Sequence, residues 1–251
     1  IPAITLGGAD ITGSLRGGQL GANIALRDAT LPSYQAQLDE FSETLAGRFA
    51  AQGLSLFTDA SGNIPTGGGT PAQAGYVGFS ADIQVDPSVQ ANPALVRDGT
   101  TAITGGPTGP TAFTPNPADG PAGFTALITR VLDNTFGADV QPGVAQPSPN
   151  VTGLGPSGTL SAPYVVPATL GSFATSLVAA DATDSANATT QLSTEQTVQT
   201  GLSTKLSSET GVNMDTEMTQ MITLQNAYGA NARVMSVVQS MFSQLLQAVA
   251  V

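Results

Sequence analysis

The side chains that could do acid–base or metal chemistry in this chain are mostly aspartates. Two pairs stand four and three residues apart, Asp82 with Asp86 and Asp181 with Asp184. Paired carboxylates can hold a cation or act together as general acid and base. Neither pair has the oxygen-rich spacing of a calcium loop, so solvated turn or helix residues are the simpler interpretation. We therefore predict no metal site and no catalytic site at these aspartates.

A glycine-rich hexapeptide and a single lysine are the other chemical candidates. Gly153–Gly158 matches the dinucleotide pattern G-x-G-x-x-G, which has meaning only between a strand and a helix. Pro156 removes one amide that would face a pyrophosphate, and no long strand precedes the motif. Lys205 could serve only as the base of a Ser–Lys pair, and on a polar helix face it is expected to be solvated. The sequence predicts no cofactor.

Composition argues against most enzyme classes. The 251 residues include no histidine and no cysteine, so the usual proton shuttle, the commonest metal ligand and the thiolate nucleophile are missing. Seven basic and 18 acidic residues give a net charge of −11, which would repel nucleic acid. No run of about eighteen apolar residues occurs, so no membrane span is expected. These features predict a non-enzymatic structural protein.

The strongest pattern lies in the last forty residues. From Met214 to about Val249, one row of positions recurs at alternating spacings of four and three over five heptads, apolar except for two glutamines. Such a row is typical of a helix that packs against other helices, and its length of about 50 Å indicates an extended bundle. Methionines at this spacing favour core packing, with an adaptable partner-binding surface as the alternative. The predicted assembly residues are Met214, Met218, Met221, Tyr228, Met235, Phe242, Leu246 and Val249.

A second long helix is expected before it, over about residues 167–210. Gly211 can end this helix and Asn213 can cap the next one. Its apolar residues are sparse, and residues 179–191 include no large side chain. We expect the two helices to form a hairpin over residues 166–251, whose seam is completed by a missing segment or a neighbouring subunit.

Residues 1–165 are expected to form a mixed α/β outer domain with Gly/Pro-rich loops. The predicted fold class is mainly α with a smaller β-containing region, a long antiparallel coiled-coil-like pair beside a turn-rich mixed domain. The expected elements are short strands leading into a helix over 4–26, a helix over 31–49 with Pro32 in its first turn and Gly53 as its stop, strands at 76–79 and 83–85, a helix over 122–136, and a loop or linker over 141–163.

Several segments resemble flagellar proteins. Residues 211–218, 224–234 and 241–246 (GVNMDTEM, LQNAYGANARV and MFSQLL) are similar to the C-terminal helix shared by the rod, hook and hook-associated families of axial proteins. Residues 17–40, beginning GGQLGANIALRD, resemble the central region of the hook-associated protein 1 (FlgK) family. Residues 82–95 resemble a later segment of that family.

The resemblance implies a secreted structural subunit of the junction between the bacterial flagellar hook and filament, outside the cell. Its implied partners are other copies of itself, the hook protein, the second junction protein and an export chaperone. Ile1–Gly8 are typical of the interior of a longer protein, so we expect a preceding region with its own helix.

Two alternatives stay open at this point. One is another flagellar axial protein, of the hook or the rod. The other is a surface-exposed adhesin or glycan-binding module, which would need an aromatic platform. The aromatic residues available for it are Tyr76, Phe79, Phe113 and Tyr164.

Overall fold

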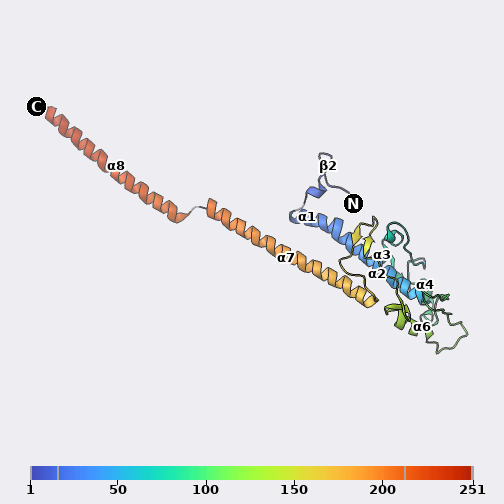
Figure 1. Ribbon diagram of the computed structural model, residues 1–251. Helices are drawn as coiled ribbons and strands as arrows, with labels where there is room; N and C mark the ends of the chain where they lie inside the picture. Colours follow the sequence, from blue (N-terminus) through green and yellow to red (C-terminus); the bar gives the residue numbers. More distant parts are fainter. Residues whose placement is uncertain (1, 16, 212, 250–251) are drawn as a thin grey trace. The chain divides into compact units, whose positions relative to one another are not determined.

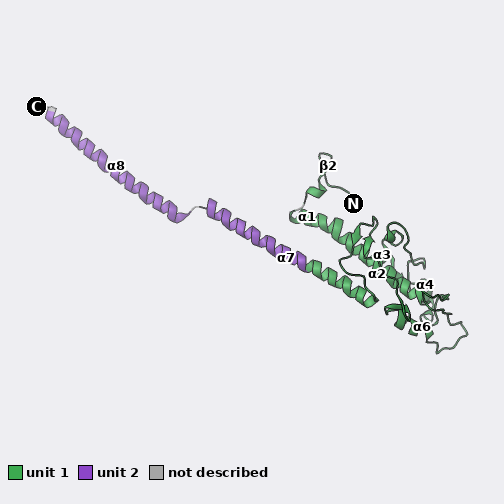
Figure 2. Ribbon diagram, viewed as in Figure 1, with its two compact units in different colours: residues 1–185 green, residues 186–251 purple. Residues whose placement is uncertain are grey.

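A computed structural model of the chain describes residues 2–15, 17–211 and 213–249. The chain forms two compact units, residues 1–185 and 186–251 (Figure 2). Helices make up 57% of the chain and the strands are short antiparallel pairs, so the predicted fold class, mainly α with a small β region, is confirmed. The units divide inside a long helix. The predicted domain boundary at 165/166 stays a prediction.

Unit 1 is organised around one long helical run. It comprises α1 (Gly18–Ala25), the π-helical turn η2 (Leu26–Thr30) and α2 (Leu31–Ala51), shown in Figure 1. Pro32 lies in the first turn of α2 as predicted, but the chain is already helical before it. Because proline has no N–H to donate to the preceding turn, a regular hydrogen-bond ladder is interrupted there. The wider π turn, in which Leu31 N–H donates to Leu26 O, lies directly before it.

Gly53 ends this helical run, as the sequence predicted. Its φ of +98° lies in the left-handed region that favours glycine. Gly53 N–H donates to Ala50 O and Leu54 N–H donates to Phe49 O, which are the two hydrogen bonds of a Schellman motif. A Cβ on Gly53 would lie 2.3 Å from Phe113 Cδ1, so the same residue also lets the core approach the helix end.

The described strands pair in twos. The first pair is the predicted hairpin before α1, and the predicted strand at 83–85 appears in the second pair. The last two pairs correct the prediction that residues 141–163 are a loop or linker, because this tract folds into hairpins at glycines with positive φ, such as Gly143 and Gly158. The pairs are β1 (Thr5–Leu6) with β2 (Ala9–Asp10), β3 (Phe57–Thr58) with β4 (Gln84–Val85), β5 (Asp139–Gln141) with β6 (Val144–Ala145), and β7 (Thr152–Leu154) with β8 (Leu160–Ser161).

Short helical segments connect these strands. The strand predicted at 76–79 is wrong, because Gly78 has φ +88° and the Asp39 carboxylate accepts hydrogen bonds from the N–H groups of Gly78 and Ser80, which starts a helix. The helix predicted over 122–136 begins later, at Ala126. The segments are η1 (Thr12–Ser14), η3 (Ala72–Gly75), α3 (Phe79–Asp82), α4 (Pro87–Ala91), α5 (Leu95–Asp98), α6 (Ala126–Arg130) and the π turn η4 (Val131–Thr135).

Two small apolar clusters form the core of unit 1. One contains Phe49, Leu54, Phe113 and Leu127, and the other contains Ala46, Tyr76 and Phe79. Each cluster includes a residue from the C-terminal half of α2, Phe49 in the first and Ala46 in the second. This half of α2 therefore contributes to both parts of the core.

Buried polar groups hold the loops to α2. Glu40, 1% exposed, accepts hydrogen bonds from Gln73 Nε2 (3.1 Å), Tyr76 Oη (2.6 Å) and the N–H of Asn150 (2.5 Å). Burial raises the pKa of the Tyr76 hydroxyl, and its hydrogen bond to Glu40 raises it further. Since Asn150 belongs to the 141–163 tract, Glu40 fixes that tract to the helix.

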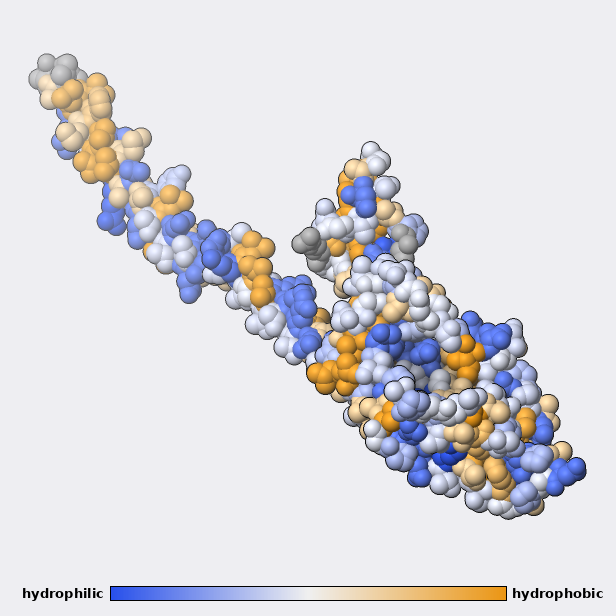
Figure 3. Space-filling view, turned by 45° about the vertical axis from the view of Figure 1, so that its right-hand side comes forward, coloured by the Kyte–Doolittle hydropathy of each residue, from blue (hydrophilic) through white to orange (hydrophobic). Residues whose placement is uncertain are grey.

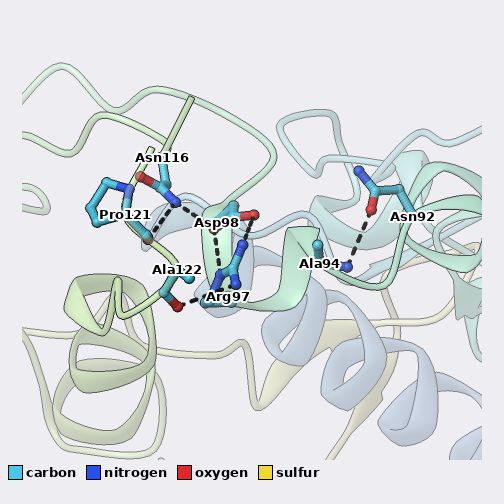
Figure 4. A network of polar contacts seen from close by, with 7 residues as sticks. All are labelled: Asn92, Ala94, Arg97, Asp98, Asn116, Pro121 and Ala122. Carbon is cyan, nitrogen blue, oxygen red and sulfur yellow. Dashed lines mark hydrogen bonds and ion pairs between the residues drawn. The ribbon is translucent and has the colours of Figure 1, made fainter. Parts of the chain in front are cut away.

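A second polar network closes the loops after α5. Arg97 and Asp98 form an ion pair at 2.7 Å, and Asn116 Nδ2 donates to the same carboxylate at 2.8 Å (Figure 4). The hydrogen bonds from Arg97 and then Asn116 lower the pKa of Asp98 to about 2. Arg97 also donates to Ala122 O, which connects this network to the segment before α6.

Two long helices complete the chain, α7 (Leu170–Thr210) and α8 (Met214–Val249). Leu170 and Phe173, in the first turn of α7, are buried in unit 1. From residue 186 onward, every side chain that the structure describes is exposed. The antiparallel pairing of α7 with α8 stays a prediction.

Candidate assembly surface

The N-terminus of α8 is capped as the sequence predicted. Asn213 Oδ1 accepts hydrogen bonds from the N–H groups of Asp215 (3.0 Å) and Thr216 (3.4 Å). Asp215 and Glu217 lie in the first turn, where the partial positive charge of the helix end favours anions. A Cβ on Gly211 would lie 2.2 Å from Ser207 O, so a residue without a side chain is needed where α7 ends. Local chemistry thus defines where α8 begins.

The row of predicted assembly residues, here called the a/d seam, follows α8 from end to end. Seven of its side chains are more than half exposed, Tyr228 at 72% and Phe242 at 64% among them. Val249 closes the helix, and its side chain lies outside the described residues. Figure 3 shows apolar surface gathered over the C-terminal part of α8. The other described members are Met214, Met218, Met221, Met235 and Leu246.

The apolar stripe widens in the second half of α8. Here further large apolar side chains are exposed beside the a/d seam, at 40% to 63%. Contiguous apolar surface of this kind marks an interaction site in a protein that folds in water. These additional residues are Val234, Val238, Met241 and Leu245.

The start of α7 packs against α2, a partner that sequence reasoning missed. Within unit 1, Phe173 of α7 packs edge-on against Phe41 of α2, with ring centroids 5.2 Å apart. Tyr34 Oη donates to Asp184 Oδ2 at 2.9 Å, and burial followed by this bond raises the pKa of Tyr34 to about 12. The two contacts run in opposite directions along the two helices, so the start of α7 pairs antiparallel with α2. The signal was the row Tyr34, Leu38 and Phe41, spaced like the a/d seam.

An apolar groove follows this α2–α7 contact. Its volume is about 310 Å³, and Leu38, Leu177 and Val178 contribute to its walls. Leu38 and Val178 stay 47% and 69% exposed. The α2–α7 pair therefore also leaves apolar surface uncovered.

A cleft on another side of α2 has a few ionisable side chains among mostly uncharged residues in its walls. Its volume is about 280 Å³, and Glu43 and Arg48 contribute to its walls. Burial, and next the charge of Glu40, raise the pKa of Glu43 to about 7. Arg48 donates to Gly137 O and Ala168 O, so its guanidinium holds backbone carbonyls.

The other chemical candidates have structural roles. Asp86 caps α4 by accepting the N–H of Ser88, and Asp184 accepts the hydroxyl of Tyr34. Lys205 on α7 and Asp82 at the end of α3 are both exposed. Within the described ranges, no group of three or more acidic side chains is arranged to hold a metal ion.

The glycine-rich hexapeptide forms the β7–β8 hairpin. Gly153, Gly155 and Gly158 have positive φ, and the N–H of Gly155 donates to Gln73 Oε1 at 2.6 Å. Because a strand follows the motif instead of a helix, it does not form a phosphate-binding loop.

The aromatic residues considered for a glycan platform are mostly inside the protein. Tyr76, Phe79 and Phe113 are buried, at 3%, 3% and 6% exposure. Tyr164 is half-buried and packs against Phe173. These rings stabilise unit 1 and three of them cannot stack on a sugar.

No helix in the described ranges is both long and apolar enough to cross a membrane.

Comparison with known proteins connects the C-terminal helix to one family. Residues 207–248 match the family described as flagellar basal body rod FlgEFG protein C-terminal. No curated protein and no solved structure matches the chain. The matched residues cover almost all of the a/d seam and its cap. The match supports a structural, non-enzymatic protein of the flagellar axis.

Proposed function

We propose that this chain is a subunit of the junction between flagellar hook and filament, and that it assembles by packing α8 against helices of other axial subunits. The observation behind the proposal is the a/d seam, which is continuous over α8 and exposed at its described positions. Burying a side chain the size of leucine or methionine contributes about 1.5–3 kcal/mol, so several such residues give a strong drive to associate. The family match lies on the same helix.

The choice of the junction within the flagellar axis rests on the first half of the chain. Residues 17–40 and 82–95 resemble the hook-associated protein 1 family. The first of these segments becomes α1, η2 and the start of α2, the helical run on which unit 1 is organised. The partners proposed on this basis are further copies, the hook protein and the second junction protein. Export through the flagellar channel, with a chaperone, would place the assembled chain outside the cell.

A rod or hook subunit is the second candidate. The family match favours it, because the description of the matched family names the flagellar basal body rod. Both candidates use the same helix in the same way, and they differ in the neighbour to which the chain binds.

Binding to isolated flagellar structures tests the proposal. The full chain would be added to hook–basal bodies that lack filaments and junction proteins, and its position would be read by immunogold electron microscopy. We expect label at the distal end of the hook. The variant Phe242→Ser with Leu246→Ser should lose this label, because two large apolar side chains leave the a/d seam.

The matched control is Gln247→Ser with Ser240→Ala, which changes the polar face of the same segment and should bind normally. Circular dichroism of each variant verifies that helix content is retained. Label along the rod, or equal binding by the Phe242→Ser, Leu246→Ser variant, would contradict the junction proposal.

A further inference from the structure

All the sulfur atoms of the chain lie on α8. The sequence has no cysteine, and its five methionines all belong to this helix, whereas residues 1–213 include none. Four of them occupy the a/d seam and are 53% to 74% exposed. These are Met214, Met218, Met221 and Met235, and the fifth, Met241, lies beside the seam. The helix on which assembly is proposed to depend therefore also concentrates one kind of side-chain chemistry.

The first three seam methionines form one exposed patch. They line an open hollow of about 460 Å³ on the surface of α8, together with Glu217, Gln220 and Leu224. Because the described part of unit 2 is exposed throughout, these thioethers are open to small solutes in the single chain.

An exposed thioether reacts with peroxides. Hydrogen peroxide transfers one oxygen atom to the sulfur, so that an S–O bond forms, the O–O bond breaks and one molecule of water leaves. The sulfur loses two electrons, which the peroxide gains, and the product is methionine sulfoxide. Since the chain has neither cysteine nor tryptophan, its methionines are the side chains that a peroxide oxidises most readily.

Oxidation would remove the apolar character of the first part of the a/d seam. From Met214 to Gln225 the apolar positions of this seam are all methionines. Met235 is the one large apolar seam residue between Tyr228 and Phe242. A sulfoxide is polar, and burying it in an apolar interface costs free energy. The oxidised seam would therefore keep large apolar side chains only at Tyr228 and from Phe242 onward.

We propose that the four seam methionines are a reversible modification site through which hydrogen peroxide controls assembly. In the single chain they are oxidised to sulfoxides, and the oxidised chain does not assemble until methionine sulfoxide reductases reduce it. Once α8 is packed against other helices, burial protects the same thioethers, so that only unassembled chains are sensitive. This inference rests on the proposed assembly function and adds a regulation of the same surface.

Binding to hook–basal bodies after oxidation tests the proposal. The full chain would be treated with hydrogen peroxide, the excess removed with catalase, and the sulfoxide at each methionine measured by mass spectrometry of peptides. We expect sulfoxide at all four seam positions and at least about tenfold weaker binding in co-sedimentation, since polar groups would have to be buried. Treatment of the oxidised chain with the two stereospecific methionine sulfoxide reductases and a thiol reductant should restore binding.

Leucine variants separate the a/d seam from other effects of peroxide. Leucine is apolar and close to methionine in volume, and it cannot form a sulfoxide. The chain with Met214→Leu, Met218→Leu, Met221→Leu and Met235→Leu should bind equally before and after peroxide. The matched control is Met241→Leu, which keeps the four seam methionines and should stay as sensitive as the wild type.

A polar substitution imitates the oxidised state without peroxide. Met218→Gln with Met221→Gln places two polar side chains of similar length in the a/d seam, and should weaken binding at least about tenfold. Thr219→Gln with Thr223→Gln, on the polar face of the same turns, should bind as the wild type does. Circular dichroism verifies that both variants retain their helix content.

The outcomes separate the two proposals. A wild-type chain that does not bind before oxidation overturns the assembly function and this inference with it. A wild-type chain that still binds with sulfoxide at the four seam positions overturns this inference alone. The same holds if these positions resist peroxide that oxidises a free methionine peptide, or if peroxide abolishes binding by the leucine variant. Should the leucine variant not bind at all, the reductases decide: binding that returns supports the inference, and binding that stays lost overturns it.

Discussion

At the scale of single residues, unit 1 depends on acidic side chains inside the protein. Asp39 and Glu40 are both 1% exposed and accept hydrogen bonds from neutral donors in loops far away in sequence. Such groups are costly to bury unless their acceptor sites are filled, and here they fix the positions of those loops. Glu43, one turn later, lies in the cleft that Arg48 also lines, and the structure records no hydrogen bond at its carboxylate that would offset its burial.

Glu43 gives a pH-dependent contribution to stability. Its folded pKa, about 7, is above the unfolded value of 4.5, so protonation favours the folded state. This contribution is fully present below pH 4.5 and is lost as the pH rises through 7. Glu43→Gln should therefore stabilise unit 1 by about 1–2 kcal/mol at pH 8, allowing for solvent screening, and should have little effect at pH 4.5. Urea unfolding at the two pH values measures the difference.

The control for this prediction is Glu209→Gln, which removes the same charge from an exposed position on α7. It should change stability equally little at both pH values. A Glu43→Gln variant that has the same stability as the wild type at pH 8 would show that this carboxylate is well solvated.

At the scale of elements, α7 and α8 differ in what stabilises them. The exposed part of α7 contains many threonines whose hydroxyls donate to the carbonyl four residues earlier, for example Thr197 to Ser193 O and Thr204 to Thr200 O. Such bonds weaken or bend a helix slightly, and β-branched residues lower its propensity. Both helices have a formed N-cap, since Thr169 Oγ1 accepts the N–H of Ser172 at the start of α7. α8 has an apolar seam and better helix formers in addition. α7 therefore depends more strongly on partners along its length.

The cap of α8 can be tested directly. Asn213→Ala removes the oxygen that accepts two backbone N–H groups, and should cost about 0.5–2 kcal/mol of helix stability. Because the described part of α8 is exposed, the loss should appear as reduced helix content in circular dichroism of the unassembled chain. Asn226→Ala, in the middle of the same helix, should instead leave helix content equal or slightly higher. Equal spectra for the Asn213→Ala variant and the wild type would argue against the cap.

At the scale of the whole molecule, the two units differ in net charge and in how much of their apolar surface is buried. Unit 1 has 14 acidic and 5 basic residues and contains the apolar clusters, so it holds −9 of the −11 net charge. Unit 2 has 4 acidic and 2 basic residues, and each of its described side chains is exposed. The apolar surface that we propose for association and most of the repulsive charge thus lie in separate parts of the chain.

Hydrogen exchange should reveal this division. In the dilute chain, amides of residues 186–249 should exchange much faster than those around Phe49 and Leu127, since exposed helices without tertiary packing open easily. On assembly, the amides of α8 should become protected while those of unit 1 change little. Mass spectrometry of peptides at low and high protein concentration measures both effects. Protection of α8 that is already complete in the dilute chain would contradict the expectation.

Sequence alone determined the features that depend on neighbours along the chain. The a/d seam, the Asn213 cap and the glycine stop at Gly53 follow from helical periodicity, from a side chain beside free N–H groups, and from a backbone angle that glycine adopts easily. These are local interactions, and the structure has the elements where the patterns place them.

Only the tertiary structure decided which segments meet. The 141–163 tract lacks any periodic pattern, yet it is held to α2 because Glu40 accepts the N–H of Asn150, 110 residues away. The start of α7 packs on α2 through Phe41 and Phe173, although sequence reasoning expected its partner in α8 or outside the chain. The heptad spacing predicts that a helix has an apolar face. It does not predict which segment covers that face, because one face can fit several partners. That choice depends on contacts between residues distant in sequence, and for α8 we propose that it depends on other chains.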